Sequence, residues 1–89
     1  MAANFTCRGG EIDLIMRDGS TLVFIEVRQR RAGAQVTAWE SIGPRKQQRM
    51  RTAALSYLAK RQISAHQPCR FDVIAIEGET QLRWVQDAL

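Results

Sequence analysis

Residues 11–28 read EIDLIMRDGSTLVFIEVR, and this segment carries the strongest signal for the fold. It contains two runs rich in branched apolar residues, 11–16 and 21–28, which are separated by Arg-Asp-Gly-Ser. An Asp-Gly pair between two such runs is typical of a β-hairpin turn, so we predict an antiparallel pair of strands. Both runs carry apolar residues at odd and at even positions. We therefore expect both faces of the hairpin to be buried, and the second face to need a further layer from another segment or another chain.

After the hairpin, the sequence predicts one helix and two more strands. Residues 29–43 are rich in Arg, Ala, Gly and Gln without a sustained period and are expected to form a loop. Pro44 suits a first helical position, and apolar residues recur every three or four positions through 45–61. Residues 70–76 and 81–85 are strand candidates. The predicted order, strand-strand-helix-strand-strand, favours an α/β fold in which the helix covers one face of a mixed sheet.

The length of 89 residues is that of one small domain, 1–89. A chain of this size buries only about 60% of the surface that it exposes when unfolded, so a partner subunit would add stability. A homodimer, intertwined with its partner, is therefore one hypothesis. Charges interrupt every apolar run, which argues against a transmembrane helix, a signal peptide and a membrane partner. We expect a cytoplasmic protein.

The net charge of +4 is unevenly distributed. The segment from Arg28 to Arg61 holds nine basic residues and one acidic residue, whereas the rest of the chain holds four basic and eight acidic residues. A basic segment of this density attracts phosphates, so nucleic acid is the first partner to expect. The alternative is a basic face that is only solvated.

Four ionisable residues, Glu11, Asp13, Glu26 and Arg28, interrupt the two apolar runs. Side chains alternate across a strand, so a hairpin loop with an even number of residues puts all four on one face. Four such groups are expensive to bury as scaffolding alone, and they predict a functional site. The alternative is an internal ion-pair network in which Arg28 neutralises one of the carboxylates.

Two hairpin registers are open. If Asp18-Gly19 is a two-residue turn, Asp13 lies opposite Phe24 and diagonal to Glu26. If the loop is residues 18–21, Asp13 lies directly opposite Glu26. In both cases the two carboxylates start from Cβ atoms roughly 5 to 8 Å apart, which is close enough to share a cation.

Two carboxylates this close repel each other unless a proton or a counter-charge arrives. A hard divalent cation, Mg²⁺ or Mn²⁺, binds such carboxylates and completes its shell with water and substrate phosphate. The ion would polarise a phosphoryl oxygen and activate water, which is the chemistry of phosphodiester hydrolysis. Arg28 would stabilise charge on the phosphate, but it cannot act as a base because guanidinium is not deprotonated in proteins.

Longer motifs carry a resemblance. The segments Arg8 to Met16, Val23 to Arg28, Ser41 to Lys46 and Cys69 to Val73 resemble the YraN-like family of uncharacterised bacterial proteins. That family is similar to the PD-(D/E)XK, or restriction-endonuclease-like, superfamily, which is related in fold to Holliday-junction resolvases. The resemblance covers nearly the whole chain and implies a restriction-endonuclease-like sheet.

The resemblance also implies residue roles. Asp13 matches the first metal-binding aspartate of the superfamily, Glu26 the second acid, and the backbone carbonyl of Val27 a further metal ligand. Arg28 stands at the position of the usual lysine, which favours a charge-stabilising role and leaves no lysine there to orient or deprotonate water. Glu11 and Asp72 match family motifs as supporting residues; for Asp72 a structural ion pair is the alternative.

Family members normally begin with a helix that often contributes another acid. Here residues 1–4 lead almost directly into the first predicted strand, so we expect this helix to be lacking and the chain to be truncated at its N-terminus. Trp39 and Trp84 are expected either to stack on bases or to be buried anchors. The predicted nucleic-acid contacts are Arg30, Arg31, Arg45, Lys46 and Arg49.

The sequence thus predicts a metal-dependent, endonuclease-like protein that cleaves phosphodiester bonds of nucleic acid, most naturally DNA. No base-reading element is evident, so selectivity for structure rather than sequence is expected. The alternative is a non-catalytic nucleic-acid-binding module on the same fold.

Overall fold

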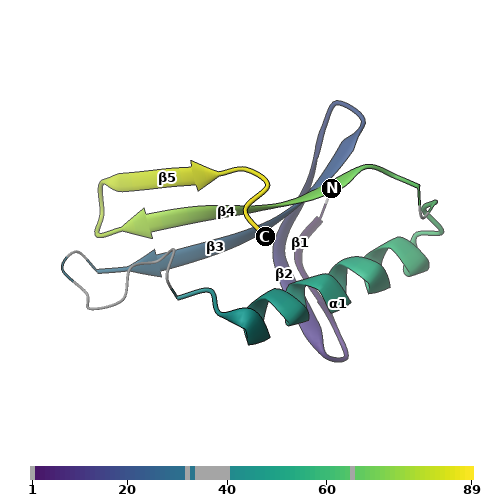
Figure 1. Ribbon diagram of the computed structural model, residues 1–89, viewed down its shortest axis with the longest axis horizontal. Helices are drawn as coiled ribbons and strands as arrows, with labels where there is room; N and C mark the ends of the chain where they lie inside the picture. Colours follow the sequence, from purple (N-terminus) through teal and green to yellow (C-terminus); the bar gives the residue numbers. More distant parts are fainter. Residues whose placement is uncertain (1, 32, 34–40, 65) are drawn as a thin grey trace.

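A computed structural model describes residues 2–31, 33, 41–64 and 66–89. These residues form one sheet of five strands, which are ordered as in the sequence, and one helix (Figure 1). β3 and β4 are parallel, and the other neighbouring pairs are antiparallel. The predicted mixed α/β fold is confirmed. The elements are β1 (Ala2–Cys7), β2 (Gly10–Asp18), β3 (Thr21–Arg30), α1 (Pro44–Lys60), β4 (Cys69–Glu77) and β5 (Gln81–Val85).

The helix follows the predicted pattern closely. Pro44 occupies the first turn, where its missing N–H costs nothing, and the helix ends at Lys60, one residue before the predicted end. Its buried side chains are Met50, Ala53, Ala54 and Tyr57, which recur at the spacing of one helical face. In the described part of the chain, no helix has the length and apolarity needed to cross a membrane.

The core lies between α1 and the β2–β3 hairpin. Tyr57 packs edge-on against Phe5 and Phe24, with ring centroids 5.3 and 6.2 Å apart, a favourable arrangement for aromatic pairs. Small alanines on the helix let the sheet approach closely. The buried cluster comprises Ile12, Ile15, Leu22, Phe24, Ala53, Ala54 and Tyr57.

Strict alternation breaks within β2. Ile12 and Ile15 are three residues apart, and regular pleating would put them on opposite faces, yet both belong to the cluster under α1. The neighbouring β1 contains Asn4 with a φ of +54°, a left-handed conformation that Asn tolerates better than most residues. The paired strands therefore change the face that they present to the helix at this level, and Asp13 lies where β2 does so.

β1 was not among the strands predicted from the sequence. Residues 2–7 read AANFTC, and Ala and Asn are poor strand formers, so their local preference does not predict a strand. The backbone hydrogen bonds with β2 stabilise the extended conformation that these residues do not favour by themselves. The predicted element order therefore gains one strand before the hairpin.

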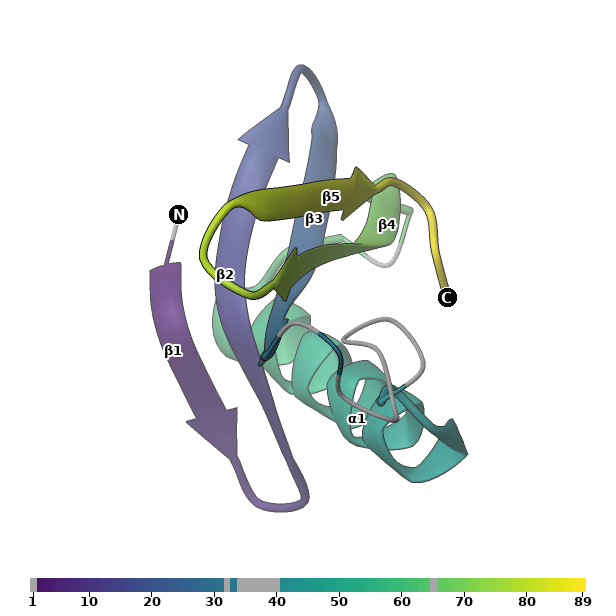
Figure 2. The ribbon, with the colours of Figure 1, turned by 90° about the vertical axis from the view of Figure 1, so that its left-hand side faces the viewer.

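The second face of the hairpin is covered without a second helix. Val23 and Ile25 are 2% and 0% exposed. β5 forms the edge of the twisted sheet next to β4 (Figure 2), and its Trp84 lines the same pocket as Val23 and Ile25. The further layer expected from the sequence is therefore not needed to bury these two side chains.

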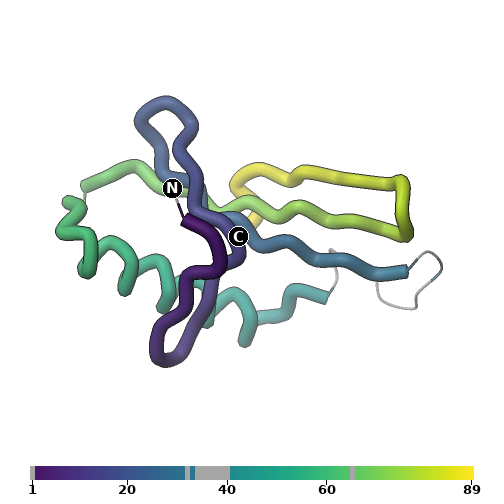
Figure 3. The backbone as a smooth tube through the Cα atoms, turned by 180° about the vertical axis from the view of Figure 1, so that it is seen from behind, coloured from purple at the N-terminus to yellow at the C-terminus, as the bar shows by residue number. Residues whose placement is uncertain are grey.

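Gly10 lets β2 pass directly against the helix. A Cβ at this position would overlap the Arg49 carbonyl oxygen and lie 3.1 Å from the Ala53 nitrogen. Figure 3 shows the β1–β2 turn lying beside α1. The approach is to backbone atoms, which cannot move aside as a flexible side chain would, so the position requires glycine.

We expect Gly10→Ala to lower the free energy of unfolding by about 1–3 kcal/mol, because α1 must shift to admit the methyl group. Urea denaturation followed by circular dichroism measures the change. Gly43→Ala is the matched control, because Gly43 has open space around it and a φ of −87°. Alanine is a weaker N-cap than glycine, so this variant should lower the free energy of unfolding by only roughly 0.5–1 kcal/mol. Equal losses in the two variants would contradict the close-packing argument.

Candidate functional site

The candidate site lies where β2 and β3 separate, a place visible in Figure 2. Their pairing ends at Leu14↔Ile25, and before Leu14 the strand β2 pairs with β1 alone. The N–H of Val27, two residues further along β3, donates a hydrogen bond of 2.8 Å to Asp13 Oδ2. In an antiparallel pair, every second residue of a strand bonds to the same neighbouring strand, so the Val27 N–H faces β2. The Asp13 carboxylate accepts the hydrogen bond that a backbone carbonyl of β2 would accept if the pairing continued. We call this place the fork.

The observed register decides between the two predicted ones. Asp18 pairs with Thr21, which leaves Gly19 and Ser20 as the turn. Phe24 pairs with Ile15, so the register that places Asp13 opposite Phe24 is wrong. The observed register is the one predicted for a loop at residues 18–21, in which Asp13 and Glu26 stand level.

Glu26 is the most buried charged residue of the fork, with 1% of its surface exposed. Its Oε2 lies 2.8 Å from Lys46 Nζ and 3.8 Å from Arg28 Nη1. Its Oε1 is buried and has no hydrogen-bond partner among the described residues. Burial raises the pKa of Glu26, and neighbouring Asp13 raises it further, whereas the hydrogen bond with Lys46 acts in the opposite direction. The fork therefore holds one carboxylate oxygen for which none of the described residues supplies a partner.

Glu11 ties the first turns of α1 to β2. Its Oε2 lies 2.9 Å from Arg49 Nη2, and its Oε1 lies 3.2 Å from Lys46 Nζ. The hydrogen bonds from Arg49 and Lys46 lower the pKa of Glu11 to about 2. Glu11 is therefore an anion throughout the physiological range.

Arg28 lies at the same place but points mainly toward the loop before α1. Its Nε donates a hydrogen bond of 3.0 Å to Ser41 Oγ. Its side chain is one quarter exposed, so the guanidinium borders both Glu26 and solvent.

The four predicted site residues thus gather at the fork, together with two residues that were predicted to bind nucleic acid. Lys46 and Arg49 were predicted as nucleic-acid contacts, and in the structure both pair with carboxylates. The one available signal was a lysine in a helix's first turn, where the helix dipole disfavours a cation. An ion-pair network is present, as the alternative interpretation expected, although Lys46 rather than Arg28 makes its shortest contact with Glu26.

Asp72 does not join this group. It pairs with Ile25, whereas Glu26 pairs with Val73, so Asp72 and Glu26 belong to opposite faces of the sheet. The predicted supporting position of Asp72 near the site is therefore wrong, and the reason is the register of the parallel pair, which the sequence does not reveal.

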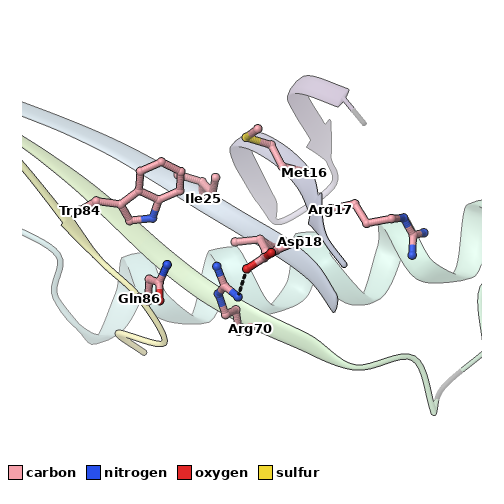
Figure 4. Close-up of a pocket in the computed structure, with 8 residues that line it drawn as sticks. Met16, Arg17, Asp18, Ile25, Arg70, Trp84 and Gln86 are labelled. Carbon is pink, nitrogen blue, oxygen red and sulfur yellow. Dashed lines mark hydrogen bonds and ion pairs between the residues drawn. The ribbon is translucent and has the colours of Figure 1, made fainter. Parts of the chain in front are cut away.

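Asp72 instead anchors the other face. It accepts hydrogen bonds from the Arg70 guanidinium, the Trp84 indole N–H at 3.0 Å and the Asp87 amide at 2.9 Å. Burial alone would raise the pKa of Asp72, but these hydrogen bonds outweigh it and hold the pKa below its usual range. Arg70 also pairs with Asp18 beside a pocket of about 210 Å³ (Figure 4). The pocket is lined by Met16, Arg17, Asp18, Val23, Ile25, Arg70, Trp84 and Gln86.

The remaining predicted nucleic-acid contacts lie nearer the surface. Arg31 and Arg45 are exposed and Arg30 is partly exposed. Arg30 and Arg31 line an open pocket of about 410 Å³ between the end of β3 and the β4–β5 turn. Trp84 is 48% exposed, with its N–H anchored on Asp72, and Trp39 lies outside the described residues.

The lowered pKa of Glu11 predicts a pH-dependent contribution to stability. Its pKa falls from an ordinary 4.5 in the unfolded chain to about 2 in the fold, so the contribution is complete above pH 4.5 and is lost as the pH falls toward 2. We expect Glu11→Gln to cost about 0.5–1 kcal/mol at pH 7, because water screens this partly exposed group. Urea denaturation of both proteins at pH 7 and pH 2.5 should show the difference shrinking at the lower pH.

Glu79→Gln serves as the control, since Glu79 is exposed at the β4–β5 turn, outside the fork. It should change the stability little at either pH. A Glu11→Gln cost that is the same at both pH values would contradict the ionic role of Glu11.

Comparison with known proteins places this chain in a family. A model of the uncharacterised protein family UPF0102 matches residues 1–76. A UPF0102 protein of Pseudomonas syringae pv. syringae (strain B728a) is 48% identical over 89 residues, which cover 96% of this chain and 72% of the relative. UPF0102 proteins of Yersinia pseudotuberculosis serotype O:1b (strain IP 31758) and Yersinia pestis bv. Antiqua (strain Angola) are 57% identical over 88 residues, covering 98% of this chain and 74% of each relative. The chain therefore belongs to the uncharacterised protein family UPF0102, which is the YraN-like family that its motifs resemble.

Proposed function

We propose that this protein is a metal-dependent, endonuclease-like protein that cleaves phosphodiester bonds in nucleic acid, with Mg²⁺ or Mn²⁺ held by Asp13 and Glu26. The observation that carries the proposal is the buried Oε1 of Glu26, which has no hydrogen-bond partner among the described residues. Leaving a buried carboxylate oxygen unpaired costs free energy, and such a group calls for an explanation such as an ion. The proposal supplies that explanation.

The donor set fits a hard cation. Asp13 and Glu26 offer carboxylate oxygens, and the carbonyl of Val27 lies on the side of β3 that faces Asp13, because the N–H and C=O of one strand residue point the same way. Across residues 2–31, 33, 41–64 and 66–89, no three or more side chains of His, Cys, Asp or Glu are arranged so that they could hold one metal ion together. Mg²⁺ suits such a site, because it is commonly bound by one or two carboxylates together with water and substrate phosphate.

The bound ion would supply Lewis-acid activation of the phosphoryl group and of water. The chain's own residues do the rest. Asp13 is oriented by the Val27 N–H, so its carboxylate faces the fork without a conformational search. Arg28 is partly exposed beside Glu26, and in this proposal it binds a phosphate oxygen and stabilises the charge that develops there.

Exposed basic residues support nucleic acid as the substrate. With Lys46 and Arg49 committed to carboxylates, the predicted contacts that remain for phosphate are Arg30, Arg31 and Arg45. Phosphate contacts position a nucleic acid without reading its bases, which agrees with selectivity for structure over sequence.

A second candidate function is a nucleic-acid-binding module without catalysis on the same fold. One observation favours it: Lys46 already lies 2.8 Å from Glu26 and so neutralises a carboxylate that would otherwise recruit a metal ion. The two candidates share the basic residues and differ in whether Asp13 is needed.

We expect Asp13→Asn to reduce cleavage of branched, single-stranded or duplex DNA at least about 100-fold in the presence of Mg²⁺ or Mn²⁺, while DNA binding is retained. Asn keeps a side-chain oxygen for the Val27 N–H, so the fold should survive. Gel-based cleavage assays and isothermal titration calorimetry with Mn²⁺ measure the two effects.

Asp87→Asn is the matched control, since Asp87 is exposed and has a φ of +52°, which Asn also tolerates. It should cleave like the unmodified protein. If the unmodified protein neither binds Mn²⁺ nor cuts any of the three DNAs, the enzyme proposal fails and the binding module remains.

We also expect the affinity for DNA to fall steeply between 50 and 200 mM salt, and Arg45→Ala to reduce the slope of log affinity against log salt by about 0.9. Fluorescence anisotropy with a labelled oligonucleotide measures both. Arg83→Ala removes an exposed arginine of β5, outside the basic segment, and should leave the slope unchanged. A slope that responds equally to both changes would refute the assignment of Arg45.

A further inference from the structure

Lys46 holds an unusual position for a lysine on a helix. It lies in the first turn of α1, its side chain is 21% exposed, and its Nζ lies between the carboxylates of Glu26 and Glu11. A lysine that served only to bind phosphate would extend its ammonium into water. This ammonium instead points into the fork.

Lys46 is the nearest cation to Glu26 by a clear margin. Its Nζ lies 2.8 Å from Glu26 Oε2, whereas Arg28 Nη1 lies 3.8 Å from the same oxygen and donates through Nε to Ser41. The charge of the buried Glu26 carboxylate is therefore balanced by a side chain of the helix, not by its neighbour on β3.

The position is favourable only because of the carboxylates. The first turn of α1 contains no acidic residue, and the positive end of the helix dipole repels an ammonium there. The flexible stem of Lys46 also reaches Glu11, whose Oε1 lies 3.2 Å from Nζ. Lys46 can therefore leave Glu26 without losing every anionic partner.

From this geometry we propose that Lys46 is the resident counter-ion of Glu26, and that a divalent cation entering between Asp13 and Glu26 displaces its ammonium toward Glu11. The inference rests on the metal site of the proposed function, and it adds that the site is preloaded with a cation of the chain's own. Metal binding is then a cation exchange rather than the filling of an empty anionic pocket. Its consequence is that Lys46 weakens the apparent affinity for metal.

The sign of that effect provides the test. Isothermal titration calorimetry with Mn²⁺ should show tighter binding for Lys46→Met than for the unmodified protein, by roughly tenfold, which is the lower end of what one nearby charge does to an ionic equilibrium. Mn²⁺ should also raise the melting temperature of Lys46→Met more than that of the unmodified protein, because more binding energy stabilises the fold.

Lys60→Met is the matched control for loss of one positive charge from the same helix. Lys60 lies in the last turn, with its Nζ 5.5 Å from the centre of the Phe5 ring, and its removal should leave the Mn²⁺ affinity unchanged. Lys46→Gln keeps a hydrogen-bond donor near Glu26 without the charge, and it should reproduce the tighter binding if Lys46→Met does not fold.

The outcomes separate this inference from the proposed function. If the unmodified protein binds Mn²⁺ and both Lys46 variants bind it equally well or less well, Lys46 is not a competing counter-ion and the inference is overturned, while the metal site stands. If neither the unmodified protein nor a folded Lys46 variant binds Mn²⁺, the metal site fails and the inference fails with it. Tighter binding in the Lys46 variants, but not in Lys60→Met, supports both.

Discussion

The hydrogen bond from the Val27 N–H to Asp13 Oδ2 is the contact on which the arrangement of the fork depends. Before Leu14, β2 pairs with β1 and no longer with β3. Where the two strands separate, the backbone N–H of Val27 has no carbonyl of β2 to bind. A buried, unpaired N–H would cost about 1–3 kcal/mol. A carboxylate at residue 13 satisfies that donor and at the same time brings a negative charge beside Glu26. The Asp13 side chain therefore both satisfies the Val27 N–H and contributes a carboxylate to the candidate site.

The fork survives in so small a protein because its charges balance. The carboxylates of Glu11, Asp13 and Glu26 face the cations of Lys46, Arg49 and Arg28, and each cation lies within 4 Å of a carboxylate. Buried ion pairs rarely add stability over apolar packing. They do make the start of α1 dependent on the two strands, so the helix and the fork are held by the same contacts. Any ion that enters must therefore rearrange bonds that also anchor the helix.

The buried polar residues on the two faces of the sheet have different roles. On the face of Glu26, carboxylates meet the start of α1. On the face of Asp72, a single buried carboxylate gathers Arg70, Trp84 and the Asp87 amide, which fixes β5 against β4. Every oxygen of Asp72 is satisfied by these groups, whereas Oε1 of Glu26 is not satisfied by any described residue. That contrast between two buried acids separates a structural carboxylate from a candidate ligand.

Local chemistry made part of this predictable. The Asp-Gly turn, the branched apolar runs and Pro44 before a helical repeat predicted the hairpin and the helix, and even loop parity predicted that Asp13 and Glu26 would meet. β1 escaped because its residues are weak strand formers that need β2 as a partner. The pairing of Lys46 with Glu26 and the face that Asp72 occupies were not predicted, because helix docking and the register of a parallel pair depend on contacts between distant segments.

The order of residues along the chain shows which charged residues lie inside an apolar hairpin, and therefore where a site could form, because alternation along a strand is a local property. Three features depend on the folded arrangement: which cation faces Glu26, which face Asp72 occupies, and which carboxylate oxygen has no partner among the described residues. These are outcomes of packing α1 and β4 against the hairpin, and no local preference of the chain encodes the distance between segments that meet only after folding.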